Sequence, residues 1–506
     1  MDEKEEKIMT SGKMKQLLAL VVVLVACIAF YSWFSSYKEK EQEKEDEKNT
    51  VKTETVLKLD KKNLISLKYA YNDKEYVVNY DSKNDKGKIK GKEKWPFNQD
   101  TLRTMISSVV SISSERAMES TDKSEYGLDK PSKKVVVKTK EDDKEKTYKL
   151  LFGNAAPNEA GYYFMVDGEE KIYVVSSTVY DAFEYDDISL LRVETIDSVN
   201  SSLVYDVDIA SKDFVLKAKY DGKIQDGDGR WIISKPYSSK QKGVTSIFTE
   251  YFVNYESLVY DKCVAYKPKD LGKYGLKNPK FRVDLKYYEE VASEDSSDDS
   301  KKSDDKDEAK ASYNKKTLSL LIGKEVKEDY DGESTVTGYY AMSKGGDRVY
   351  VMESSVVESI MNNTAFAFVD ATINGTDLLQ YENVKIETSK KTYNFKKESK
   401  SVKGDDGKST VEYTYKVNGK KIDTAKGDSI GSALFNLSYS GEIGNKKHGN
   451  GKVAVTFTFK GKKDGAKDMV IKLKNFDSVN YKVDKDGEEI FTVSKESISG
   501  FLNLFE

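Results

Sequence analysis

The sequence YGLDKP occupies residues 126–131, and a near-copy, YGLKNP, occupies residues 274–279. Glycine at the second position allows backbone conformations that other residues resist, and proline at the sixth position keeps the residue before it extended. The motif therefore predicts one structural turn that occurs twice. The residues that define it are Tyr126, Gly127, Pro131, Tyr274, Gly275 and Pro279.

The residues before each turn also repeat. Apolar residues at three- and four-residue spacing lie over 102–110 and over 244–252, an offset of 142 residues, and each run predicts a helix with one buried face. A tryptophan precedes each run, Trp95 in the first copy and Trp231 in the second. The two tryptophans are therefore predicted to occupy equivalent places.

The residues after each turn repeat as well. LLFG at 150–153 corresponds to LLIG at 320–323, and both copies continue with a Gly-Tyr-Tyr strand and a valine-rich strand that ends in serines. Matches in the same order at near-constant spacing indicate a duplication. The tyrosines of the Gly-Tyr-Tyr strands are Tyr162, Tyr163, Tyr339 and Tyr340.

A weaker third copy follows. Asp428 is placed to cap a helix whose apolar face lies over 430–437, and a strand at 491–494 leads into apolar positions at 498–502, as at the ends of the other two copies. This region has neither the tryptophan nor the YGL-Pro turn. We interpret it as a degenerate copy.

Short β-branched or aromatic runs bounded by Asp-Gly and Asn-Gly pairs are typical of antiparallel hairpins. The predicted fold class is α+β, with tandem units of antiparallel sheet that carry about two helices each, behind one transmembrane helix. The predicted parts are a leader (1–16), a transmembrane anchor (17–34), a charged stalk (35–63), unit 1 (64–192), unit 2 (203–372) with an acidic insert (289–311), and unit 3 (384–506).

The anchor prediction rests on residues 17–34, which are uncharged and long enough to span a bilayer as a helix. Lys13 and Lys15 precede this run, so the positive-inside rule places the N-terminus in the cytoplasm and everything after residue 35 outside it. An alternative is that residues 24–27, LVAC, are a lipobox with a lipidated Cys27. The apolar residues that continue after Cys27 favour the uncleaved anchor.

Composition excludes several classes of activity. The chain has 506 residues and a net charge of −3. A chain with this charge has no excess of positive charge that would attract nucleic acid. One histidine, His448, and two cysteines, Cys27 and Cys263, leave too few groups for a histidine triad, a zinc site or a disulfide framework. No cofactor or metal is expected, and His448 is interpreted as a residue of a polar turn.

The repeated aromatic residues allow two interpretations. Trp95, Trp231 and the four paired tyrosines could form a binding platform for a sugar or a peptide. A copied fold also keeps its core, however, and recurrence in both units favours packing.

These motifs together resemble the bacterial family known as domain of unknown function 4340. The resemblance is best over 64–192, includes 203–372 with its insertion, and is faint in the last third. It implies a membrane-anchored, extracytoplasmic protein that works beside the permease and ATPase subunits of an ABC transporter, and it supplies no catalytic residues. The expected function is thus a non-enzymatic scaffold or auxiliary component; the alternatives are a glycan- or peptide-binding module of the cell envelope and a carboxylate-based envelope hydrolase.

The topology can be tested with a reporter enzyme fused after residue 60. The lysines before the anchor predict that an enzyme active only outside the cytoplasm gains activity in this fusion. Activity of a cytoplasmic reporter at the same position would contradict the assigned side. A mature mass that begins at a lipidated Cys27 would establish the lipoprotein alternative.

Overall fold

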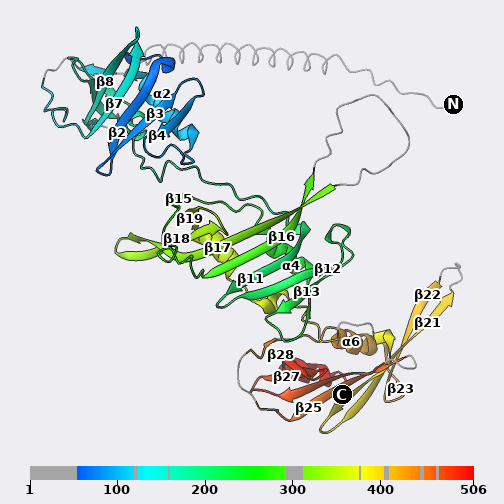
Figure 1. Cartoon of the computed structure of the whole chain (residues 1–506). Helices are drawn as coiled ribbons and strands as arrows, with labels where there is room; N and C mark the ends of the chain where they lie inside the picture. The colour runs from blue at the N-terminus through cyan, green and yellow to red at the C-terminus, as the bar shows by residue number, and fades with distance from the viewer. Residues whose placement is uncertain are drawn as a thin grey trace, which may run out of the picture. The chain divides into compact units, whose positions relative to one another are not determined.

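The computed structural model contains three large antiparallel sheets, coloured blue to cyan, green, and yellow to red in chain order (Figure 1). It describes residues 54–114, 116–118, 122–157, 160–291, 312–374, 378–403, 409–444, 449–462 and 467–506. The chain divides into two compact units, Met1–Arg192 with the first sheet and Val193–Glu506 with the second and third.

The membrane anchor remains a prediction, because residues 17–34 and Cys27 lie outside the described residues. So do His448 and residues 292–311 of the acidic insert. Within the described stretches, no helix is long and apolar enough to cross a membrane.

In each sheet, the order of the strands from one edge to the other differs from their order along the chain. The strands are given below in their order across the sheet. The first sheet contains β4 (Lys86–Ile89), β3 (Lys74–Asp81), β2 (Leu64–Tyr71), β7 (Lys133–Glu141), β8 (Lys144–Ala155), β9 (Tyr162–Val166), β10 (Ile172–Val175) and β6 (Arg116–Met118). The second contains β14 (Gln241–Gly243), β13 (Arg230–Lys235), β12 (Val215–Asp221), β11 (Val204–Ser211), β16 (Phe281–Val291), β17 (Ser312–Tyr330), β18 (Glu333–Ser343), β19 (Arg348–Glu353) and β15 (Lys262–Tyr266). The third contains β23 (Lys420–Lys421), β22 (Ser409–Val417), β21 (Thr392–Lys403), β20 (Tyr381–Thr388), β25 (Val453–Gly461), β26 (Met469–Asn475), β27 (Asn480–Lys485), β28 (Glu488–Ser494) and β24 (Gly441–Glu442).

Two α-helices accompany each sheet in the described part of the chain. They are α2 (Gln99–Val110) and α3 (Ser177–Asp181), α4 (Thr245–Val253) and α5 (Ser354–Met361), and α6 (Thr424–Phe435) and α7 (Lys495–Asn503). The remaining elements are a two-stranded sheet of β1 (Glu54–Lys58) and β5 (Ser111–Ser114), and the 3₁₀ turns η1 (Lys61–Asn63), η3 (Ser201–Leu203), η4 (Ile224–Asp226), η5 (Ala365–Phe368) and η6 (Leu378–Gln380).

The second and third sheets have the same strand order. We number the nine strands of each sheet from one to nine along the chain. From one edge of the sheet to the other, they then lie in the order 4-3-2-1-6-7-8-9-5. The first sheet has this order without the fourth strand. The sheet-rich α+β class predicted from the hairpin signals is confirmed, and the third region shares its topology with the second although it lacks the tryptophan and the turn.

The helix register predicted from the sequence is wrong by one turn. Helices α2 and α4 begin at Gln99 and Thr245, an offset of 146 residues instead of 142. Leu102 therefore corresponds to Phe248, and both are fully buried, whereas Val244 is the residue before α4 and not part of its buried face. Apolar positions four residues apart lie on one helix face, so a shift of four leaves the pattern nearly unchanged.

The predicted equivalence of Trp95 and Trp231 is also wrong. Trp231 lies in β13 opposite Tyr220, is 1% exposed, and stacks on Phe248 of α4 with ring centres 4.2 Å apart. In the first sheet the residue opposite Tyr80 at this position is Gly87. Trp95 follows β4 and is half-buried, with Lys92 4.4 Å above its ring.

Each sheet fills the contact between its third strand and its first helix differently. In the first sheet, Gly87 lets Leu102 come so close that an added Cβ would lie 3.1 Å from that side chain. The second sheet places Trp231 against Phe248. In the third sheet, Tyr415 of β22 lies over Gly427 of α6, where an added Cβ would be 2.1 Å from the ring. A large side chain on one element is thus matched by a small or flat one on the other.

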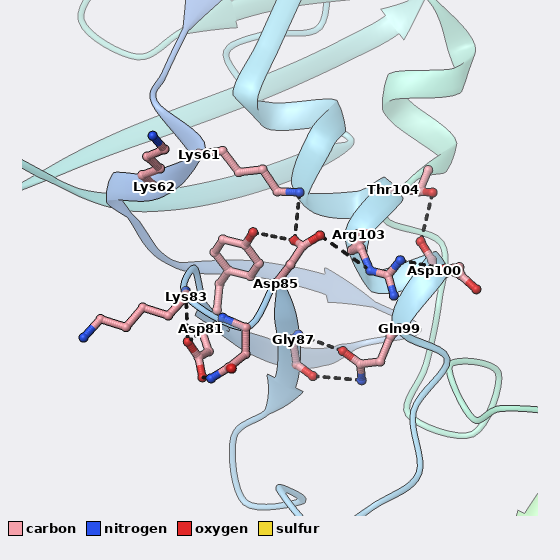
Figure 2. Close-up of polar contacts among 12 residues, drawn as sticks. Lys61, Lys62, Asp81, Lys83, Asp85, Gly87, Gln99, Asp100, Arg103 and Thr104 are labelled. Atoms are coloured by element: carbon pink, nitrogen blue, oxygen red, sulfur yellow. Dashed lines mark hydrogen bonds and ion pairs between the residues drawn. The ribbon is translucent and has the colours of Figure 1, made fainter.

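The missing fourth strand of the first sheet is replaced by one side chain (Figure 2). The Gln99 amide accepts a hydrogen bond from the Gly87 N–H at 2.9 Å and donates one to the Gly87 carbonyl at 3.2 Å. In the second sheet, the corresponding residue Trp231 pairs with Gly243 of β14 instead. A side-chain amide carries the same donor and acceptor as a backbone peptide, so Gln99 can cap the edge of β4.

Two expected boundaries are corrected. The first folded unit includes residues 54–63, assigned above to the stalk, because β1 pairs with β5 and both Leu57 and Leu59 are buried. Residues 289–291, assigned to the acidic insert, form the end of β16 and pair with 312–314 of β17.

These differences predict unequal effects for the two tryptophans. Trp231→Ala should destabilise its sheet by about 3–5 kcal/mol, because a fully buried ring leaves a cavity. Trp95→Ala should cost only about 1 kcal/mol, the value of a half-exposed ring under a lysine. Urea titration monitored by limited proteolysis of each compact unit measures both, and equal losses would contradict the assigned positions.

Candidate functional site

The YGL-Pro turns serve the fold. Gly127 and Gly275 have φ angles of +70° and +73°, the left-handed region that favours glycine. In both copies the carbonyl of the motif tyrosine accepts a backbone hydrogen bond of 2.9 Å from the strand that it crosses, at Asn154 and at Lys324. Each motif leucine, Leu128 or Leu276, then packs into a small apolar cluster on that sheet.

These clusters lie on the face of the sheet opposite the helices. Phe152 of β8 contacts Tyr180 of α3, and its neighbour Leu151 joins the cluster around Leu128. Successive residues of a strand point to opposite faces, so the helices cover one face and the turn covers part of the other. The second sheet has the same arrangement, with Leu276, Met342 and Val349 in its cluster.

The paired tyrosines, for which the sequence favours packing over a binding platform, are packed within their own compact units, and three of the four contact another ring. Tyr163 meets Tyr126 edge-on at 4.7 Å, and Tyr340 meets Tyr274 edge-on at 5.1 Å. Tyr162 stacks on Tyr180 at 3.7 Å, and Tyr339 is 5% exposed. Trp95 and Trp231 belong to different compact units. The motif rings are therefore used for packing.

A polar cluster in the first unit surrounds Asp85 (Figure 2). Its carboxylate accepts hydrogen bonds from Lys61 at 2.8 Å and from the Tyr80 hydroxyl at 2.6 Å, and Arg103 lies 3.8 Å away. The lysine and then the tyrosine lower the pKa of Asp85 below its ordinary value. The cluster ties η1 and the β3–β4 turn to α2, which is a structural role.

The third sheet carries charge where the other two sheets carry the turn clusters. Ile471, Leu473 and Val483 of β26 and β27 face the helices. The alternate positions on these strands hold Lys474, Lys482 and Asp484, and Glu489 of β28 joins them. This charge cluster was not predicted, although lysine at every second position of a strand with a buried apolar face is a signal in the sequence.

The charge cluster is internally paired. Lys474 lies 2.7 Å from Asp484 and 2.8 Å from Glu489, and Glu489 also pairs with Lys482, whose side chain is 1% exposed. Burial acts to raise the pKa values of Asp484 and Glu489, but hydrogen bonds from the lysines outweigh it and hold both pKa values below their ordinary range. The same bonds raise the pKa of Lys474.

The second and third sheets are joined by residues 368–373, which we call the linker strand. It bonds on one side to residues 242–244 at the end of β14 and on the other to residues 437–439 after α6, with N···O distances of 2.7–3.0 Å. Phe491 of β28 adds ring contacts to Tyr237, Phe366 and Tyr439. The joint is therefore held by backbone hydrogen bonds and an aromatic cluster.

A cavity of about 240 Å³, which we call the joint cavity, opens at this linker strand. Its lining includes the apolar residues Val483, Ile490 and Phe491 and the charged residues Lys240, Lys242, Asp370, Lys485, Asp486 and Glu488. A lining of many charged and few apolar residues suits a small polar ligand. It is the candidate functional site of the described residues.

Two other chemistries find no support in the described ranges. No group of three histidine, cysteine, aspartate or glutamate side chains there is placed to hold a metal ion. Cys263 is buried, and burial raises the pKa of its thiol to about 11, which makes it a poor nucleophile.

Comparison with known families now places the chain. The family model described as a domain of unknown function, DUF4340, matches residues 88–242 and 249–450, together more than half of the chain. The chain belongs to the DUF4340 family. No curated protein and no solved structure matches it.

The DUF4340 matches cross the predicted unit boundaries. The first match begins in β4 of the first sheet and ends in β14 of the second, and the second match runs from α4 into the third sheet. The second match thus includes the linker strand and residues 437–439 that bond to it, but not β27 and β28 on the other side of the joint. The DUF4340 description assigns no activity.

The charge cluster predicts how the third sheet responds to Glu489→Gln. Removing this carboxylate leaves the buried Lys482 poorly compensated and should destabilise the sheet by about 3 kcal/mol at pH 7. Because the pKa values of Asp484 and Glu489 are lowered on folding, their stabilisation is present above about pH 4 and lost as pH falls further. The variant should therefore lose less stability than the parent on acidification.

Glu398→Gln is the matched control, because Glu398 pairs with Lys396 at 3.0 Å and Lys416 at 2.9 Å on an exposed part of the same sheet. Its effect on urea unfolding at pH 7 should be much smaller. Equal effects of the two variants would contradict the importance of the charge cluster.

Proposed function

We propose that this DUF4340 chain is a non-enzymatic scaffold of the bacterial cell envelope and an auxiliary component of an ABC-type transporter complex. Residues 17–34 anchor it in the membrane as a single pass, and the sheets stand outside the cytoplasm. The observation that carries the proposal is that the repeated motifs have structural roles. Their rings and turns hold sheets together and leave no shared aromatic platform within the described residues.

The build of the second compact unit supports the proposal. Two sheets of the same strand order are joined by the linker strand and by the ring contacts of Phe491. An interface made of backbone hydrogen bonds keeps two modules in a fixed relation, which suits a protein that positions partners. The open faces carry paired charges of both signs, such as Asp208 with Lys217 and Arg282, and paired charges keep an exposed sheet face soluble.

The proposal predicts a defined complex in native membranes. The full-length chain, tagged at its C-terminus, solubilised in mild detergent and purified, should retain the permease and ATPase subunits of one ABC transporter in fixed ratio. Quantitative mass spectrometry measures the ratio. An unrelated single-pass protein with the same tag is the control, and equal amounts of transporter subunits in both preparations would contradict the proposal.

A further inference from the structure

The joint cavity has cations without ion-pair partners. The joint cavity has three lysines, Lys240, Lys242 and Lys485. Among the described residues, no carboxylate oxygen lies within 4.0 Å of the ammonium nitrogen of any of them, so none forms an ion pair. Two of its three carboxylates already accept hydrogen bonds from neutral groups. Asp370 accepts from the Thr372 backbone at 3.1 Å and from its hydroxyl at 2.7 Å. Glu488 accepts from the Ser239 hydroxyl.

Lys485 is the most constrained of the three lysines. It is half-buried in β27, and its ammonium group donates a hydrogen bond of 2.9 Å to the Ile373 carbonyl of the linker strand. An ammonium group has three donors, so this bond leaves two of them for another acceptor. Burial lowers the pKa of Lys485, with Asp486 and Asp370 acting to raise it and Lys242 to lower it. An anion beside Lys485 would offset the cost of burying this charge.

The rest of the joint cavity suits the body of a small molecule. Tyr439 stacks on Phe491 with ring centres 4.5 Å apart, and burial raises the pKa of the tyrosine hydroxyl to about 12, so it stays protonated and can donate a hydrogen bond. The volume of about 240 Å³ accommodates a molecule of metabolite size and not a folded partner.

We infer that the joint cavity is a binding site for a small organic anion, whose carboxylate or phosphate group is held by Lys485 and Lys242. The ligand thus contacts Lys242 of β14 and Lys485 of β27 at once, so it bridges the second and third sheets. This inference does not depend on the proposed scaffold function. The joint cavity lies within this chain and is present whether or not the chain binds a transporter.

The test uses the full-length protein in detergent, with inorganic phosphate, acetate and glucose as probes at constant ionic strength. Ligand-detected NMR of each probe gives its dissociation constant, and phosphate and acetate distinguish the two anionic groups. Lys485→Met should weaken binding of the preferred anion roughly tenfold or more, because it removes a charge-assisted hydrogen bond. Lys242→Met changes an exposed side chain that does not support the fold, and it should also weaken binding.

The matched control is Lys262→Met, an exposed lysine of β15 outside the joint cavity. It should leave binding unchanged. Protection of the buried Cys263 thiol against modification checks that each variant keeps the second sheet folded. Absence of binding by both anions, equal weakening in all three variants, or binding of glucose that survives Lys485→Met would each overturn the inference.

Discussion

The contact between the third strand of each sheet and the helix that follows it determines how each of the three sheets is built. After the strands at one edge of the sheet, the chain crosses back over one face of the sheet as a helix. This helix needs apolar side chains along the side that faces the sheet. Trp231 against Phe248, Gly87 against Leu102, and Tyr415 against Gly427 are three solutions of the same packing problem. Because cores are close-packed, a change on one side of this contact requires a change on the other.

Once this face is covered, the opposite face is free to differ. The first two sheets cover part of it with the YGL-Pro turn and an apolar cluster, whereas the third carries paired lysines and carboxylates there. The segments that leave the first two sheets are alike as well. Residues 190–192 bond to 96–98 as residues 368–370 bond to 242–244, so the backbone leaves both sheets in the same way. After residues 368–370 the third sheet follows, and residues of both sheets line the joint cavity.

The sequence was most informative where local chemistry is repeated. The turn glycines, the paired tyrosine strands and the sheet-rich class could be predicted because each rests on a short pattern. The helix register could not, since an amphipathic helix looks alike after a shift of one turn. Trp95 became the apparent counterpart of Trp231 because a tryptophan precedes the helix in both copies. The true counterpart, Gly87, carries no sequence signal, and its partner Gln99 becomes recognisable only when the missing fourth strand is seen. The joint cavity is lined by residues of both sheets and of the linker strand, which are far apart in the sequence, so no local sequence pattern predicts it.

The third region, despite its divergent sequence, has the strand order of the second. In that order β20 is an interior strand, and residues Val384 to Glu387 pair with β21 on one side and with β25 on the other. Hydrogen exchange of the full-length protein at residue resolution tests this directly. An interior strand predicts slow exchange at every consecutive amide from Val384 to Glu387, because each N–H is bonded to one neighbour or the other. Slow exchange at alternate amides only, as in an edge strand, or rapid exchange at all four, would contradict the account.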